Sequence, residues 1–235
     1  MDSTDPEAVL LACVPQRRHR LPFHGIRPGA RRERPPASLE SDPAVRSVTV
    51  PPRPGKDVVD PLLAEHPGAR LIVHGDDADL AAVVLRLLRR SALGTEVAYL
   101  PVDRRSAAAA SWGVPVSPAA AARLARTGAA RPEPLVRDDN GGVLVGRGEI
   151  PDLYGEAYCD ATRVFRGRVP RLVVDAGPDG VRIRGGRGVT AAQGRAIQIG
   201  TTGATPVRDG EPHPREIRRW AWYRHTEPWN PVLPG

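Results

Sequence analysis

Two adjacent carboxylates at the end of an apolar run are the first residues in this sequence whose position suggests chemistry. The segment RLIVHGDDADLAAVVLRLL, residues 70–88, passes from a short strand-like run through HGDDA (74–78) into a helical pattern. Strand, tight turn and helix is the arrangement that aims backbone N–H groups at phosphate oxygens. Such turns need glycines, because a Cβ blocks the approach of backbone to phosphate. This turn has one glycine, Gly75, followed by Asp76 and Asp77.

The carboxylates of this turn have two interpretations. Asp76, Asp77 and Asp79 have the oxygen ligands that Mg²⁺ prefers. A carboxylate is also favoured at a helix N-terminus, where it accepts hydrogen bonds from free N–H groups. Capping is much commoner than metal binding, so we expect Asp77 or Asp79 to cap the following helix. We assign no metal site and no firm cofactor.

The composition limits the class of protein. The chain has 235 residues, is 40% hydrophobic and carries a formal net charge of +7. Such a chain can bury a core, and its basic balance makes anionic partners plausible. Its two cysteines, Cys13 and Cys159, lack metal-type spacing and fit a reduced, cytoplasmic protein. No run approaches the roughly 20 apolar residues of a membrane span.

Residues 1–130 alternate strand-like runs with helical patterns, which indicates a parallel sheet covered by helices. Strands are expected near 8–14, 47–50, 71–73 and 96–102, and helices near 56–66, 79–90, 106–113 and 117–128. The clearest helix has the i, i+3, i+4, i+7, i+8 spacing, at Leu80, Val83, Val84, Leu87 and Leu88. The Pro- and Arg-rich segment 21–45 is expected to be a long loop.

Residues 131–235 are different, with short β-type runs between Gly- and Pro-rich turns and no helical period. The segment AGPDG, residues 176–180, is expected to close a hairpin. The sequence therefore predicts an N-terminal three-layer α/β domain, 1–130, followed by an antiparallel β-sandwich domain, 131–235.

Several short motifs resemble those of the diacylglycerol kinase and bacterial lipid kinase family, whose fold is similar to that of the NAD kinases. The family's Gly-Gly-Asp-Gly-Thr turn matches HGDDA, which keeps Gly75 and Asp76. Its Asn-Pro-x-Ser-Gly loop matches CVPQRRHR, which keeps only Pro15. Its Pro-x-Gly-Thr-x-Asn loop matches LPVDRRS, which keeps Pro101. SWGVP matches a short helix that ends in Leu-Gly-Ile-Pro in the family.

The segment RDGEPHPREI resembles the family's Asp-Gly-Glu-Pro segment and keeps all four residues. The resemblance implies that Glu211 is the base that deprotonates a lipid hydroxyl. The alternative interpretation of this segment is an ordinary hairpin turn, for which Asp-Gly is a common sequence.

The three nucleotide loops depart from the family pattern, and arginines occupy positions where the family has glycines. If the sheet is built as in the family, Arg17 and Arg18 meet Arg104 and Arg105 at one crevice. Guanidinium groups there could hold a small anion or a phospholipid head group. The alternative is that these arginines are solvated surface charges.

The sequence therefore favours a degenerate lipid kinase-like protein without ATP-dependent activity, acting as a binding or scaffold protein. One alternative is an active lipid kinase that uses ATP and Mg²⁺ in a divergent site. Another is a basic nucleic-acid binder in which Trp220 and Trp222 stack on bases. We disfavour it, because such aromatic stripes more often pack a core.

Overall fold

The computed structural model describes residues 6–14 and 34–235. The helices are α1 (Ala37–Glu40), α2 (Lys56–Glu65), α3 (Asp77–Arg89), α4 (Ala107–Trp112) and α5 (Pro118–Thr127). The strands of the first half are β1 (Ala8–Cys13), β2 (Val45–Val50), β3 (Arg70–Gly75), β4 (Glu96–Pro101) and β5 (Ala129–Ala130). Those of the second half are β6 (Glu133–Asp138), β7 (Val143–Leu144), β8 (Arg147–Cys159), β9 (Thr162–Gly177), β10 (Gly180–Ile183), β11 (Ala192–Gly194), β12 (Ala196–Ala204), β13 (Val207–Arg208), β14 (Glu211–Pro212) and β15 (Ile217–Leu233).

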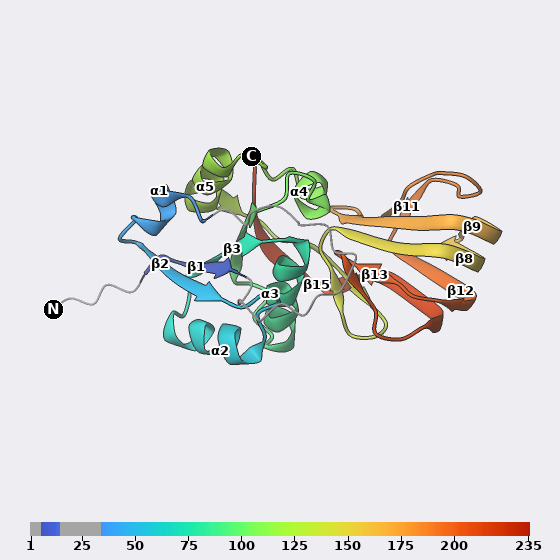
Figure 1. Ribbon diagram of the computed structural model, residues 1–235, viewed down its shortest axis with the longest axis horizontal. Coiled ribbons are helices and arrows are strands. Elements are labelled where there is room, and N and C mark those ends of the chain that lie inside the picture. Colours follow the sequence, from blue (N-terminus) through green and yellow to red (C-terminus); the bar gives the residue numbers. More distant parts are fainter. Residues whose placement is uncertain (1–5, 15–33) are drawn as a thin grey trace, which may run out of the picture.

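The first half of the chain forms a parallel sheet in the order β2-β1-β3-β4, with helices on both faces (Figure 1). One apolar layer joins the sheet to α2, α3 and α4, and the other joins it to α1 and α5. The central strand β1 is buried along its whole length, as expected of a strand covered on both faces. The predicted three-layer α/β architecture is confirmed.

Local signals in the sequence account for several helix boundaries. In α3, Leu80, Val83 and Val84 are buried as the period predicts. Helix α4 begins after Ser106, whose hydroxyl accepts a hydrogen bond from the Ala109 N–H at 2.9 Å. It ends at Gly113, which adopts the left-handed conformation that glycine tolerates best. The segment 21–45 is not loop throughout, because its described part contains α1 and the start of β2.

The second half is antiparallel β-structure, packed around an apolar core of its own. The predicted hairpin at 176–180 is present, since Gly177 at the end of β9 pairs with Gly180 at the start of β10. Trp220 and Trp222 are 1% and 0% exposed and contact each other edge to face. These two rings therefore belong to the core, as the sequence favoured, and offer no surface for stacking on bases.

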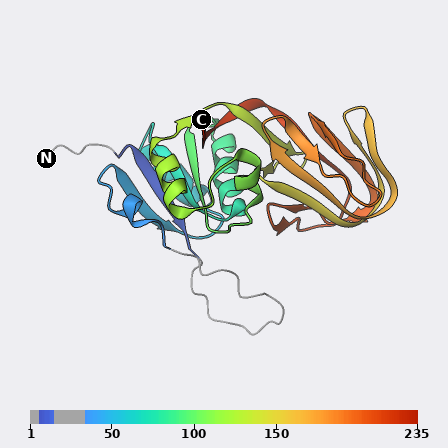
Figure 2. The same cartoon turned by 90° about the horizontal axis from the view of Figure 1, so that it is seen from above.

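Strand β15 links the two halves (Figures 1 and 2). Its first part pairs with β12 and β6 in the β-structure, whereas Asn230 and Pro231 pair in parallel with β4. The C-terminus thus lies in the α/β half, although the predicted division assigned all of 131–235 to the β-sandwich. The apolar residues Trp229, Val232 and Leu233 explain this return, because they are buried against the first sheet and its helices.

Candidate functional site

The turn between β3 and α3 is held by a reciprocal pair of carboxylates. The Asp76 side chain accepts a hydrogen bond from the Asp79 N–H, and the Asp79 side chain accepts one from the Asp76 N–H, both at 3.0 Å. This capping box satisfies two N–H groups at the start of α3. A Cβ on Gly75 would lie 2.4 Å from the Asp79 carboxylate, so the cap requires glycine there. The predicted role of Gly75 and Asp76 in binding a cofactor remains a prediction.

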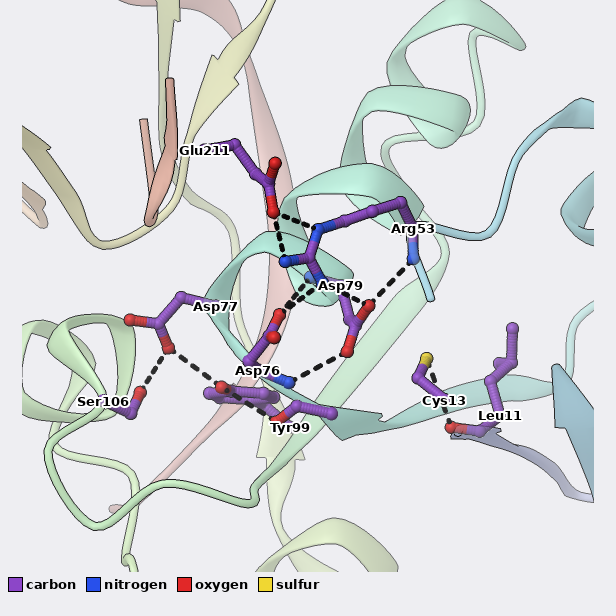
Figure 3. A network of polar contacts seen from close by, with 10 residues as sticks. Leu11, Cys13, Arg53, Asp76, Asp77, Asp79, Tyr99, Ser106 and Glu211 are labelled. Atoms are coloured by element: carbon purple, nitrogen blue, oxygen red, sulfur yellow. Dashed lines mark hydrogen bonds and ion pairs between the residues drawn. The ribbon is translucent and has the colours of Figure 1, made fainter. Parts of the chain in front are cut away.

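The side chain of Asp77 points away from its own helix and toward α4 (Figure 3). One carboxylate oxygen accepts hydrogen bonds from the Ser106 hydroxyl and, at 2.9 Å, from the Tyr99 hydroxyl. The other accepts from the N–H groups of Ala107 at 2.8 Å and Ala108 at 3.2 Å. The N-cap of α3 is Asp76, which was not one of the two residues expected to cap this helix. Of those two, Asp79 completes the capping box from the third helical position, whereas Asp77 accepts N–H groups at the start of the next helix.

Tyr99, on β4, helps to hold the Asp77 carboxylate in place through its hydroxyl. Burial raises the pKa of the Tyr99 phenol well above its ordinary value, and the negative charge of Asp77 raises it further. The hydroxyl therefore stays protonated and donates to the carboxylate.

Arg53 joins this turn to the β-structure and was not among the predicted site residues. Its backbone N–H donates to Asp79 at 2.8 Å, and its Nη1 lies 2.7 Å from a carboxylate oxygen of both Asp76 and Asp79. On its other side, Nε donates to Glu211 at 3.0 Å, and Nη2 contacts the same carboxylate (Figure 3). Burial alone lowers the pKa of Arg53, but its bonds to Glu211 and the aspartates outweigh that effect and raise the pKa. No local pattern distinguishes this arginine in PPRPG.

Glu211, the residue that the family resemblance marks as a base, lies at the edge of this network. Its side chain is 53% exposed and is held by the Arg53 guanidinium. The carboxylate marked as a base is therefore engaged in an ion pair with Arg53.

Asp209, two residues before Glu211, is the most perturbed carboxylate described. It is 8% exposed and accepts hydrogen bonds from the N–H groups of Val145 at 3.0 Å, Gly146 at 2.8 Å and Arg147 at 2.8 Å. Burial raises its pKa from 3.8 to about 7, opposed by these N–H groups and reinforced by the charge of Asp77. From the sequence, Asp209 was noted as the first residue of the Asp-Gly-Glu-Pro segment or of a hairpin turn, with no role of its own.

Two cavities border the segment that follows β4, and Asp103 and Arg105 line both. The acidic cavity, about 410 Å³, lies between the two halves of the chain. Its carboxylates are Asp76, Asp77, Asp103, Glu149 and Asp209, and its arginines are Arg53, Arg105 and Arg147. The basic cavity, about 510 Å³, lies against β4 and α5 and contains Arg34, Arg104 and Arg105.

Of the four arginines predicted to form an anion site, the structure describes two. Arg17 and Arg18 lie outside the described residues. Arg104 and Arg105 are exposed and line the basic cavity, and Arg105 also faces the cavity that contains Asp76 and Asp77. A clamp formed by both loops therefore remains a prediction.

The described residues contain neither a metal-binding cluster nor a helix that could span a membrane. Among residues 6–14 and 34–235, no group of three or more His, Cys, Asp or Glu side chains is placed to hold a metal ion. In the same ranges, no helix has the length and apolar character needed to cross a membrane.

The parallel sheet with its attached β-structure, the cleft between them and the turn after β3 define a diacylglycerol kinase-like fold. A diacylglycerol kinase from Bacillus anthracis strain Sterne is 13% identical, with a TM-score of 0.66 over 99% of this chain and 98% of that chain. An NAD kinase from Archaeoglobus fulgidus, solved in complex with ATP, is 12% identical, with a TM-score of 0.50 over 80% of this chain and 84% of that one.

These structures confirm the predicted resemblance in fold. No protein-family model and no curated protein matches the sequence. At such low identity the likeness establishes the fold and leaves the activity to be argued from the site.

Proposed function

We propose that this chain is a diacylglycerol kinase-like protein without ATP-dependent phosphotransferase activity, and that it acts as a binding or scaffold protein. The observation that carries the proposal is the position of Asp77. Its carboxylate accepts the N–H groups of Ala107 and Ala108, at the start of the helix after β4. An anion of the protein's own thus takes backbone donors at a helix start beside the acidic cavity, which Ala107 lines, and those donors are not free for a phosphate.

Electrostatics supports the same conclusion. A phosphate charge about 4 Å from a carboxylate meets a repulsion of roughly 4 kcal/mol at an effective dielectric constant near 20. The acidic cavity has more carboxylates than arginines in its lining. Arg53 already pairs with Asp76, Asp79 and Glu211. Without a bridging cation, the carboxylates that line the acidic cavity therefore oppose a triphosphate.

An active lipid kinase with a divergent site is the second candidate, and Asp209 is the observation that favours it. A buried carboxyl group with a pKa of about 7, beside a cleft, has the properties of a general acid or base. Its three backbone donors give it a structural explanation as well, so we rank this candidate second.

The test is transfer of radiolabelled phosphate from ATP to diacylglycerol and to NAD by the full chain, with Mg²⁺ present. We expect no transfer above background and no ATP binding by calorimetry. Transfer that is abolished by Glu211→Ala would overturn the proposal and identify Glu211 as the base. Transfer that survives Glu211→Ala but is abolished by Asp209→Asn would overturn it in favour of Asp209. Glu156→Ala, at an exposed position on β8, serves as the matched control.

A further inference from the structure

We propose that the basic cavity binds a small phosphate monoester with an apolar body, held by Arg34, Arg104 and Arg105. The inference rests on the proposed function, because it names the ligand class of a protein that binds without transferring phosphate. It also places the anion on the side of the sheet that α5 covers, in a cavity whose lining does not include Asp76 or Asp77.

The charges in the basic cavity favour a dianion. Three arginines and one carboxylate, Asp103, line it, which leaves a formal excess of two positive charges. The Asp103 side chain is engaged within its own loop, where it accepts the Arg105 N–H at 2.8 Å. Among the described residues, neither Arg104 nor Arg105 forms an ion pair with a carboxylate, whereas Arg53, Arg86 and Arg147 do. Guanidinium groups bind phosphate oxygens in pairs, so such a cluster matches a phosphate monoester.

Helix α5 adds to this positive potential. It has 10 residues, begins at Pro118 beside the cavity, and Ser117 at its N-cap makes no side-chain capping hydrogen bond. The first N–H groups of a helix have no partner within it, and its dipole favours negative charge there. The helix start therefore reinforces the arginines.

The rest of the lining indicates an organic body on the anion. The volume of about 510 Å³ is in the range of small-molecule sites and exceeds the needs of a bare ion. The lining also has an apolar part, with Leu100 and Pro101 at the end of β4, Val102 directly after it and Ala121 from α5. Val116, 36% exposed, also lines the cavity and is one of the few large apolar side chains left exposed in the described part of the chain. An apolar group on the ligand would cover it.

The experiment is calorimetric titration of the full chain with hexyl phosphate, inorganic phosphate and hexanol. Hexyl phosphate should bind at least about 10-fold more tightly than inorganic phosphate, and hexanol should not bind. Arg104→Gln and Arg105→Gln should each weaken hexyl phosphate about 10-fold or more, the usual range for a charged hydrogen bond. Arg123→Gln, an exposed arginine on the same helix α5, should leave the affinity unchanged.

Val116→Ser tests the apolar lining separately from the arginines. It should weaken the binding of hexyl phosphate and leave the binding of inorganic phosphate unchanged. The inference is overturned if hexyl phosphate does not bind, if hexanol binds equally well, or if binding persists in the Arg104→Gln, Arg105→Gln double variant. Kinase activity is measured separately. ATP transfer with no hexyl phosphate binding would refute both proposals, whereas a lack of both would refute only this one.

Discussion

At the scale of single residues, four aspartates near the turn between β3 and α3 differ in what they contact. Asp76 and Asp79 pair with Arg53, and Asp77 accepts the amides and hydroxyls around α4. Asp209 accepts three backbone N–H groups and has no ion pair within the described residues. A buried carboxylate without a cation is costly to ionise, which is why the pKa of Asp209 is raised to about 7.

The first prediction follows from this pKa. Between the unfolded pKa of 3.8 and the folded pKa of about 7, the folded state binds more protons than the unfolded state. The contribution of Asp209 to stability is therefore complete below the lower value and is lost as the pH rises through the upper one. The slope is at most about 1.4 kcal/mol per pH unit. Urea unfolding across this range should show the loss in the native chain and a flatter profile in Asp209→Asn.

The control for this experiment is Asp152→Asn, since the Asp152 side chain is 78% exposed. Its profile should run parallel to that of the native chain. A parallel profile for Asp209→Asn as well would contradict the role assigned to Asp209.

At the scale of elements, α4 is a six-residue helix between the sheet and the β-structure. A helix this short is marginal by itself and depends on its ends. At its start, the Ser106 hydroxyl accepts the Ala109 N–H, and Asp77 accepts the N–H groups of Ala107 and Ala108. The carboxylate of one helix thereby positions the next.

The second prediction is that Asp77→Ala lowers the free energy of unfolding by about 1–2 kcal/mol, because it removes a cap and leaves donors without a partner. Asp57→Ala is the matched control, since Asp57 is exposed in the first turn of α2, where no side-chain capping hydrogen bond exists. Urea unfolding of the two variants gives the comparison. Equal, small losses would show that Asp77 does not support α4.

At the scale of the whole molecule, β15 ties the two halves together. It begins in the β-structure and ends beside β4. Trp229, near its end, is 3% exposed, and its ring meets that of Trp112 on α4 edge to face at 5.6 Å. The last strand, the helix after β4 and the first sheet therefore share one core.

The third prediction is that Trp229→Ala destabilises the chain by about 3–5 kcal/mol, as expected for a large buried aromatic residue. We also expect unfolding followed by circular dichroism and by tryptophan fluorescence to coincide, because β15 couples both halves. Tyr154→Ala, at a side chain 51% exposed, should change stability by less than about 0.5 kcal/mol. Two separate transitions, with only one shifted by Trp229→Ala, would contradict the coupling.

The sequence by itself determined the features that depend on neighbouring residues. The apolar period of α3, the Ser106 and Gly113 ends of α4 and the β9–β10 hairpin are encoded within a few positions. The order of such segments was enough to predict an α/β sheet followed by β-structure, and to support the resemblance in fold.

Tertiary structure decided what each polar side chain contacts. Arg53 and Glu211 are 158 positions apart, and Asp77 meets α4 across 30 positions, so no local pattern encodes either contact. The return of β15 to β4 likewise depends on burying Trp229 in a core made by distant segments. Propensity acts over a few residues, whereas burial and ion pairing act between whatever the fold brings together. For that reason the aspartates were found from the sequence and their partners were not.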